Sequence, residues 1–415
     1  MGTKNVQPHN ESIGVSDSGV NYVIIGASAA GIAAATRLRM FDAQATISVI
    51  TQESTRPYNK CFLADYISGI KEQEALFLKS DTFFNEQRIT LVGSTKIISI
   101  DAQLKRILSA DGKQFSYDKL LIATGTNSFV PEKFKTLLGS GVFIFHTLEQ
   151  ITNIMTLCKK RHIRNVLVVG AGLSGLEAAD ALLTQFGCNV TVIDQAPHVL
   201  HSQLTEDASL YLEKRMQQVN VVFKGNCTVE NIVIHNEHVS GVEFSDGNFQ
   251  EIDIIVCAMG SRVDTTLLQA SGITWGEYGI EVDDYLQTSV SDIFAAGDCI
   301  AITDLLTKKR MRSCMWSDAM QQGMIAADVM FEKKRTYNGS TVLISTGFFG
   351  LKCAISGSFK HCLFNSKTVL KIENDTCYHH VIVDDIGLVT GFLLLGDTQR
   401  ATHLKRLIMT KTPYR

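Results

Sequence analysis

The chain has 415 residues, which is too long for one hydrophobic core and indicates two or three domains. Its apolar content of 45% and charged content of 20% are ordinary for a globular protein. The formal net charge of -3 is spread along the chain, so no basic stripe indicates nucleic acid and no polybasic run indicates a membrane surface. No apolar run reaches the roughly 18 residues that a membrane span needs, so no membrane association is expected.

The first 20 residues are polar and lack the basic and apolar regions of a secretory signal. We expect residues 1–20 to be a disordered tail, and we expect a cytoplasmic protein because export is not indicated. The ten cysteines contain no CxxC pattern, so the sequence encodes neither a local dithiol nor a zinc site, and no metal is expected. Most thiols are predicted to be reduced, buried and structural.

Two segments of the chain repeat the same order of elements. In residues 21–40 an apolar run passes through a small-residue turn into an alanine-rich helical pattern, and a second β-like run follows at 47–51. The same order recurs in residues 164–187, with its second strand at 189–194. Each segment is therefore predicted to be a βαβ unit.

Both units continue in the same way. An Asp-Gly pair predicts a hairpin at 111–112 in the first copy and at 246–247 in the second. Each hairpin leads to a hydrophobic strand closed by a small turn, within residues 119–125 and 253–260. A duplicated dinucleotide-binding module explains the whole pattern, and the predicted fold class is α/β with two Rossmann-like domains.

Turns of small residues join the first strand of each unit to its helix. Such a turn lets the backbone approach a pyrophosphate, whose charge is stabilised by the free N–H groups and the positive dipole end of the helix. A single match also fits a tight βα turn in another parallel sheet, but two matches inside complete units argue against that alternative. The candidate binding residues are Gly26, Ser28, Ala29, Ala30 and Gly31 in the first turn, and Gly170, Gly172, Leu173, Ser174 and Gly175 in the second.

The ends of the second strands indicate which ribose each unit binds. Asp194 ends the strand at 189–194, where a carboxylate accepts hydrogen bonds from both hydroxyls of an adenosine ribose. This favours NADH over NADPH, because a 2′-phosphate would face Asp194 and residues 195–198 offer no arginine. In the first unit Glu53 is the best candidate for the ribose ligand.

At this point the motifs resemble a known family. IGASAAG, LLIATG, VVGAGLSGLEAA and TSVSDIFAAGDC, in this order, look like the FAD-dependent pyridine nucleotide-disulfide oxidoreductase superfamily over residues 21–330. The resemblance implies that the first module binds FAD, that the second binds NAD(P)H, and that Asp298 holds the ribityl chain of FAD. An ordinary turn acid is the alternative for Asp298, although the small residues before it suit close approach to a ligand. The small turns after the later strands supply the further expected cofactor contacts Ala123, Thr124, Gly125, Gly260 and Gly297.

The expected architecture has three parts after the tail. A discontinuous FAD domain (21–128 and 261–330) brackets an NAD domain (129–260), and a small α+β domain follows (331–415). Residues 378–408 resemble the C-terminal domain of NADH-rubredoxin reductases and of the flavoprotein part of NADH nitrite reductases. No counterpart of the catalytic C-terminal histidine of glutathione-reductase-type enzymes is found, and His403 is expected to face solvent.

The stretch RPYNKCFLADYISG (56–69) raises the question of whether its lysine or its cysteine carries the chemistry. In the family this segment crosses the flavin, and a lysine near N5 pairs with a glutamate of the second motif. The resemblance assigns these roles to Lys60 and Glu177, and the predicted ion pair would keep the ammonium protonated. The alternative is a solvated loop lysine and a glutamate on the helix surface.

Cys61 has two interpretations that stay open. Its spacing to Tyr66, Ser68 and Gly69 resembles the redox-cysteine segment of coenzyme A disulfide reductases and NADH peroxidases. The residues after it, Phe62 to Ala64, differ from that pattern. A passive packing role is the preferred interpretation, and a reactive thiol next to the flavin is the alternative.

Four other residues receive shorter interpretations. Trp316 precedes a helix that in the family runs under the flavin, so it either shields the ring or receives a partner, or it simply packs in the core. His146, His379 and His380 have no ligand-like spacing and are interpreted as non-functional.

The predicted function is an FAD-dependent NAD(P)H oxidoreductase. Hydride passes from NADH to FAD, and the electrons then leave to a small redox protein such as rubredoxin, ferredoxin or another iron centre. One alternative is a Cys61-dependent disulfide, persulfide or peroxide reductase, or an NADH oxidase. Another is an NADH-sensing flavoprotein with a binding role, like apoptosis-inducing factor. The acceptor and the oligomeric state are not predicted.

Overall fold

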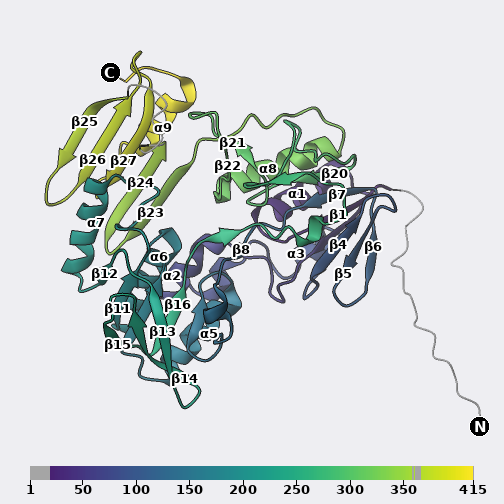
Figure 1. The fold of residues 1–415 in the computed structure, drawn as a ribbon. Coiled ribbons are helices and arrows are strands. Elements are labelled where there is room, and N and C mark those ends of the chain that lie inside the picture. Colours follow the sequence, from purple (N-terminus) through teal and green to yellow (C-terminus); the bar gives the residue numbers. More distant parts are fainter. Residues whose placement is uncertain (1–18, 358, 360–365, 415) are drawn as a thin grey trace, which may run out of the picture.

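The computed structural model describes residues 19–357, 359 and 366–414 (Figure 1). The predicted disorder of the tail therefore concerns residues that lie almost entirely outside the described ones. Within the described ranges, no helix combines the length and the apolar character that crossing a membrane requires.

The first nucleotide-binding unit is a five-stranded parallel sheet with the order β20-β7-β1-β2-β3. The predicted βαβ unit is confirmed, because β1 pairs in parallel with β2 and α1 connects them. Helices α1 and α8 pack against each other beside this sheet (Figure 1). The elements are β1 (Asn21–Ile25), α1 (Ala29–Phe41), β2 (Thr46–Ile50), β3 (Ile89–Val92), β7 (Lys119–Ile122), β20 (Ile293–Ala295) and α8 (Trp316–Met330).

The second unit repeats this arrangement. Its parallel sheet has the order β12-β11-β10-β16-β9, and helix α6 connects β10 to β11 as predicted. Helix α5 begins with a capping box between Thr147 and Gln150. The elements are β9 (Val142–Ile144), α5 (Leu148–Lys160), β10 (Asn165–Val169), α6 (Leu173–Phe186), β11 (Asn189–Ile193), α7 (Glu206–Gln218), β12 (Val222–Lys224) and β16 (Ile254–Cys257).

Small antiparallel ladders follow each unit, and both predicted Asp-Gly turns are confirmed. The turn at 111–112 joins β5 to β6, and the turn at 246–247 joins β14 to β15. Strands β8 and β17 pair with each other where the chain passes between the two sheets. The elements are β4 (Ile97–Asp101), β5 (Arg106–Ser109), β6 (Gln114–Ser116), β8 (Asn127–Ser128), β13 (Val229–His235), β14 (His238–Phe244), β15 (Phe249–Glu251) and β17 (Ser261–Arg262).

The C-terminal part is an antiparallel sheet with the order β23-β24-β27-β26-β25, covered by helix α9. Its Phe348, Phe349 and Tyr378 are buried in the same core as α6 and α7 of the NAD-type unit. The sheet thus lies against the second unit, as Figure 1 shows. The elements are β23 (Leu343–Phe348), β24 (Leu351–Gly357), β25 (Lys367–Glu373), β26 (Tyr378–Val383), β27 (Val389–Leu395) and α9 (Ala401–Thr410).

The segment after β2 packs differently from what the expected domain bounds imply. Although residues 21–128 are assigned to the FAD domain, Tyr58, Leu63 and Ile67 are buried in the core of the second unit. Helix α2 contacts both α5 and α6. This segment therefore bridges the two nucleotide-binding units, and the exact domain bounds stay a prediction. Its elements are η1 (Lys60–Phe62), α2 (Leu63–Ile67) and η2 (Gln73–Leu76).

The remaining short elements connect these parts. They are α3 (Phe83–Glu86), α4 (Glu132–Lys135), η3 (Thr266–Leu268), β18 (Trp275–Gly276), β19 (Gly279–Ile280), β21 (Ile302–Thr303) and β22 (Arg310–Met311).

Candidate functional site

The two small-residue turns have the same local geometry. Gly26 has a φ of +114°, and a Cβ on it would lie 2.1 Å from the carbonyl oxygen of Ala123. Gly170 has a φ of +112°, and its Cβ would lie 2.3 Å from the carbonyl oxygen of Ala258. Only glycine allows the turn to approach the neighbouring strand end this closely. This equivalence supports the duplication predicted from the sequence.

Each turn leads directly into a helix whose first N–H groups have no intrahelical partner. Ser28 precedes α1 and makes no side-chain capping bond. Gly172 precedes α6 and has no side chain that could cap it. A Cβ on Gly172 would meet nothing within 4 Å, so the space in front of α6 is open. These two helix ends are suited to binding the diphosphates of two dinucleotides.

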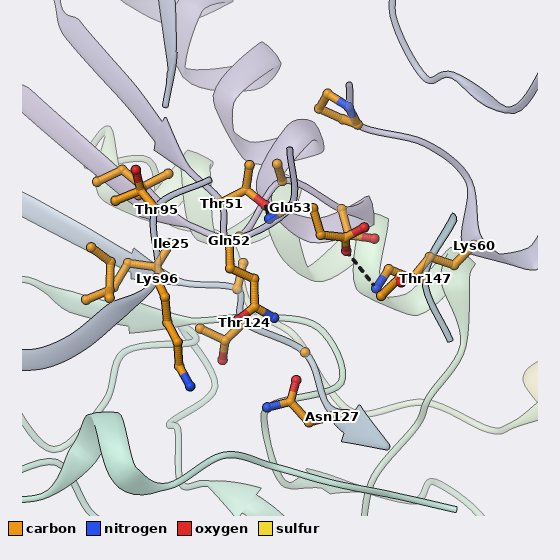
Figure 2. Close-up of a pocket in the computed structure, with 18 of the residues that line it drawn as sticks. Ile25, Thr51, Gln52, Glu53, Lys60, Thr95, Lys96, Thr124, Asn127 and Thr147 are labelled. Carbon is orange, nitrogen blue, oxygen red and sulfur yellow. Dashed lines mark hydrogen bonds and ion pairs between the residues drawn. The ribbon is translucent and has the colours of Figure 1, made fainter. Parts of the chain in front are cut away.

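A pocket lies at the carboxyl ends of β1, β2 and β7 (Figure 2). Sequence reasoning identified Gly26, Ser28, Glu53, Lys60 and the 123–125 turn among its lining, but it missed Gln52, Lys96 and Asp264. Lys96 comes from the loop between β3 and β4, and Figure 2 shows its side chain near Gln52 and Thr124. No sequence motif marks this loop, because its place in the pocket depends on the pairing of β2 with β3.

Glu53 holds Lys60 in this pocket. The Lys60 Nζ lies 3.1 Å from Glu53 Oε1, and the Tyr58 hydroxyl donates a 2.6 Å hydrogen bond to Glu53 Oε2 (Figure 2 draws the ion pair). The Tyr58 oxygen in turn accepts from the backbone N–H of Leu148, 2.9 Å away. Burial and the neighbouring Glu53 raise the pKa of Tyr58, so its hydroxyl stays a donor.

The predicted Lys60–Glu177 ion pair is not formed in the structure. Lys60 begins η1 only a short way along the chain from Glu53, so the local fold brings these two together. Glu177, one turn into α6, instead accepts a 3.0 Å hydrogen bond from the Thr346 hydroxyl of β23. Lys60 is half-buried, which also differs from the solvated loop lysine of the alternative interpretation. Catalytic roles for Lys60 and Glu177 stay predictions.

Asp298 lies in the turn that follows the buried strand β20, after Ala296 and Gly297. Gly297 before it has a φ of +88°, and its N–H donates a 2.7 Å hydrogen bond to Gln322 Oε1 of α8. Burial raises the pKa of Asp298, while Arg312 and Lys60 oppose the shift. Within the described residues, no hydrogen bond to its carboxylate is found, so its acceptor capacity is available.

Arg312 is a neighbour of Asp298 that sequence reasoning missed. Its Nη2 donates a 3.1 Å hydrogen bond to the Ser261 carbonyl, whereas its buried Nη1 has no partner among the described residues. An unsatisfied guanidinium N–H beside an available carboxylate suits a ligand that carries both phosphate oxygens and hydroxyls. FAD is such a ligand, so the residues present fit the cofactor.

Two cysteine side chains, Cys61 and Cys314, are exposed in this region. Although the Cys61 side chain reaches solvent, the protein atoms packed around it partly desolvate its thiol. This burial raises the pKa of Cys61 to about 11, and Glu177 and Asp298 add to the shift. Burial and Asp298 raise the pKa of Cys314 to about 12. Burial, and to a smaller extent the acidic neighbours, thus disfavours both thiolates. Trp316 begins α8 and is partly buried against the first core, which accords with its packing interpretation.

In the flavin-free protein, the thiol of Cys61 is expected to react slowly with iodoacetamide at neutral pH. Its alkylation rate should rise with pH toward about 11, because only the thiolate is nucleophilic. Peptide mapping by mass spectrometry measures the rate at this residue, and Cys61→Ser identifies the labelled peptide. A rate that reaches its plateau near pH 7 would instead indicate an activated thiolate.

Asp194 is positioned as a ribose ligand of the second unit. Its Oδ2 accepts a 2.7 Å hydrogen bond from the N–H of Ala171 and its Oδ1 accepts a 2.8 Å bond from the N–H of Ala196. Each oxygen keeps a lone pair for a ribose hydroxyl. Close by, His198 contacts the carboxylates of Glu206 and Glu213. The Asp194 carboxylate itself disfavours a 2′-phosphate, which agrees with the predicted preference for NADH.

The structure agrees with some of the predictions for the histidines and differs from others. His403 is exposed on α9 as expected. His146, interpreted as non-functional, lies in the pocket lining, where burial and Lys60 lower its pKa to about 4.

Among the nine described cysteines no disulfide forms and five are buried, while Cys362 lies outside the described residues. The described chain holds no group of residues suited to a metal ion.

Comparison with known proteins now identifies the family. The family model for pyridine nucleotide-disulphide oxidoreductases matches residues 20–323. The chain belongs to this family. FAD and NADH are accordingly its cofactors, and it is an NAD(P)H-dependent oxidoreductase.

Three family members illustrate the range of similarity. The chain is 32% identical over 311 residues to an NADH oxidase of Methanocaldococcus jannaschii, covering 73% of this chain and 68% of that protein. It is 30% identical over 309 residues to a rubredoxin-NAD(+) reductase of Pseudomonas putida, covering 74% and 78%. The structure of an NAD-dependent persulfide reductase from A. fulgidus superposes with a TM-score of 0.87 at 25% identity, covering 95% of this chain and 77% of that one.

Proposed function

We propose that this oxidoreductase passes electrons from NADH through FAD to a small iron-sulfur or rubredoxin-like protein. The observation that carries the proposal is the state of the two exposed thiols near Asp298. Burial raises the pKa of both the Cys61 and the Cys314 thiol, Asp298 adds to both shifts, and the Lys60 ammonium is paired with Glu53 instead of stabilising a thiolate. The flavin then remains as the electron-relaying group. The similarity to a rubredoxin-NAD(+) reductase supports the same acceptor class.

When bound, FAD supplies the redox chemistry, because it takes two electrons from NADH and releases them singly. The chain supplies position and charge. The N-terminal ends of α1 and α6 bind the two diphosphates, and the Asp298 carboxylate and Arg312 guanidinium bind the ribityl and phosphate region. Glu53, which contacts Tyr58 and Lys60, provides the carboxylate for the adenosine ribose of FAD.

A second candidate is a disulfide, persulfide or peroxide reductase that uses Cys61. Its support is that Cys61 is exposed and has Asp298, the proposed flavin ligand, among its charged neighbours. The structural similarity to a persulfide reductase points the same way. In this case flavin binding would have to lower the pKa of the Cys61 thiol.

An anaerobic NADH titration and an acceptor panel separate the two candidates. Under the preferred function, Cys61→Ser keeps FAD, consumes one NADH per flavin like the unchanged protein, and reduces one-electron acceptors within a few-fold of the original rate. Serine is nearly isosteric but forms neither a disulfide nor a sulfenate, so it isolates redox chemistry from shape.

Two results would favour the second candidate. The unchanged protein would consume about two NADH per flavin while Cys61→Ser consumes one, and a thiolate-to-flavin charge-transfer band would be present only in the former. Turnover with small disulfides or persulfides, and none with rubredoxin or ferredoxin, would also support the second candidate and exclude the preferred function.

A further inference from the structure

Lys96 lines the candidate cofactor pocket from the loop between β3 and β4, and the backbone of this loop is tied to the segment after β2. The N–H of Ser94 donates a 3.1 Å hydrogen bond to the carbonyl of Glu53. The N–H of Thr95 donates a 2.8 Å bond to the carbonyl of Thr51. The backbone next to Lys96 is therefore held in place by contacts within the protein.

The two other long basic side chains in the lining of this pocket are already paired with carboxylates. Lys60 Nζ lies 3.1 Å from Glu53 Oε1, and Arg56 forms ion pairs of 2.8 and 2.7 Å with two exposed acids outside the lining. Within the described ranges, Lys96 takes part in no ion pair. Its ammonium is exposed and available to a ligand of the pocket.

Asp264, the other carboxylate of the lining besides Glu53, also has its own partners. Its Oδ1 accepts hydrogen bonds from the N–H and the hydroxyl of Thr266, and its Oδ2 accepts a 3.5 Å bond from Asn127 Nδ2. The acids of the lining therefore leave the charge of Lys96 uncompensated.

The Lys96 side chain is directed to the part of the pocket where the first small-residue turn lies. Figure 2 shows it near Gln52 and Thr124, which line the same pocket. Thr124 adjoins the turn, because a Cβ on Gly26 would lie 3.3 Å from the Thr124 nitrogen and 2.1 Å from the carbonyl oxygen of Ala123. The ammonium and the N-terminal end of α1 thus serve one region of the pocket.

We propose that the Lys96 ammonium binds the diphosphate of FAD. The inference rests on the proposed placement of FAD in this pocket, with its diphosphate at the end of α1. The diphosphate carries the negative charge of the cofactor, and a lysine binds phosphate as a point charge through charge-assisted hydrogen bonds. The helix end offers only N–H groups and a partial positive charge. Lys96 adds a full charge to this site.

Chemical labelling of amines tests the contact directly. In the FAD-free protein, acetic anhydride should acetylate Lys96 readily, and saturating FAD or ADP should slow this reaction, whereas saturating adenosine should not. Peptide mapping by mass spectrometry measures the rate at each lysine. Lys113, an exposed lysine that follows the β5–β6 turn and does not line the pocket, is the internal control and should react at one rate throughout. Equal rates at Lys96 with and without FAD overturn the proposal.

Binding measurements with three ligands identify the moiety that Lys96 contacts. Lys96→Met should raise the Kd of the FAD-free protein for FAD and for ADP by the same factor, about threefold to fivefold at low ionic strength, and leave the Kd for adenosine unchanged. Lys96→Arg should keep the affinity for all three ligands, and Lys113→Met is the matched control. An unchanged Kd for ADP, or an equal loss for adenosine, contradicts the assignment.

Two further readouts exclude an indirect effect on the fold. The FAD affinity of the unchanged protein should fall more steeply with salt than that of Lys96→Met, because the variant lacks the screened contact. The thermal unfolding midpoint of the FAD-free protein should be the same in both, since the ammonium has no ion pair within the described chain. Equal salt dependence in the two proteins counts against the proposal.

The outcome is separable from that of the proposed function. A protein that reduces no iron protein, but whose Lys96→Met variant loses affinity for FAD and ADP alone, removes the proposed acceptor and keeps this inference. A protein that reduces rubredoxin or ferredoxin, and whose Lys96→Met variant binds FAD and ADP at the original affinity, keeps the function and removes the inference.

Discussion

Asp298→Ala is expected to bind FAD about tenfold to a hundredfold more weakly than the unchanged protein. A hydrogen bond to a charged group contributes roughly 1.5 to 3 kcal/mol, and this variant removes such an acceptor from the turn after β20. The loss should be seen as a lower flavin content after gel filtration and as a higher Kd when the apoprotein is titrated with FAD. The purified unchanged protein should be yellow, with non-covalent FAD.

Two further variants locate the effect at the carboxylate. Asp298→Asn keeps one acceptor oxygen and removes the charge, so it should lose less affinity than the alanine variant. Asp318→Ala removes a nearby acid that is occupied by a hydrogen bond from Ser313, and it should keep FAD. FAD bound at the original affinity by Asp298→Ala would refute the ligand assignment.

The fold of the two nucleotide-binding units could be predicted because its signals are local. The apolar runs, the small-residue turns and the Asp-Gly pairs each specify a strand, a tight βα connection or a hairpin within a few residues. Gly26 and Gly170 illustrate the point, since each has a positive φ and a close backbone neighbour that only glycine accommodates. The parallel pairing of β1 with β2 and of β10 with β11 then follows from the right-handed βαβ connection.

The partners of charged side chains could not be predicted in the same way. Lys60 was expected to reach Glu177, but a local contact with Glu53 at 3.1 Å forms instead. The partner of Glu177 on α6 is Thr346, which lies 169 positions away in sequence, on β23 of the C-terminal sheet. Its identity depends on how β23 docks on α6. No spacing rule covers a contact between two separately folded layers.

The unpaired Nη1 of Arg312 is a similar case. Arg312 lies in a stretch without a motif, and its charge acts on Asp298 although the two residues lie on different segments of the chain. The resemblance of TSVSDIFAAGDC to the family identified Asp298, and the small residues before it supported that assignment, whereas no pattern in the sequence marks Arg312.

Asp194→Ser is expected to move the ratio of kcat/KM for NADH to kcat/KM for NADPH toward NADPH by about tenfold to a hundredfold. The estimate corresponds to the loss of a charged hydrogen bond of roughly 1.5 to 3 kcal/mol to the ribose of NADH, and removal of the charge also relieves repulsion of the 2′-phosphate. The initial rates of flavin reduction over a range of each coenzyme, measured anaerobically in a stopped-flow instrument, give both constants.

The ratio is the decisive quantity because Asp194 also has a structural role. Its carboxylate accepts from the N–H groups of Ala171 and Ala196, so the serine variant weakens the turn, and this affects both coenzymes alike. Asp253→Ser is the matched control. Asp253 likewise accepts from two backbone N–H groups, those of Arg164 and Asn165, but it does so at the opposite end of β10. The control should lower stability and leave the ratio unchanged. If the ratio is the same in Asp194→Ser as in this control, Asp194 does not contact the ribose.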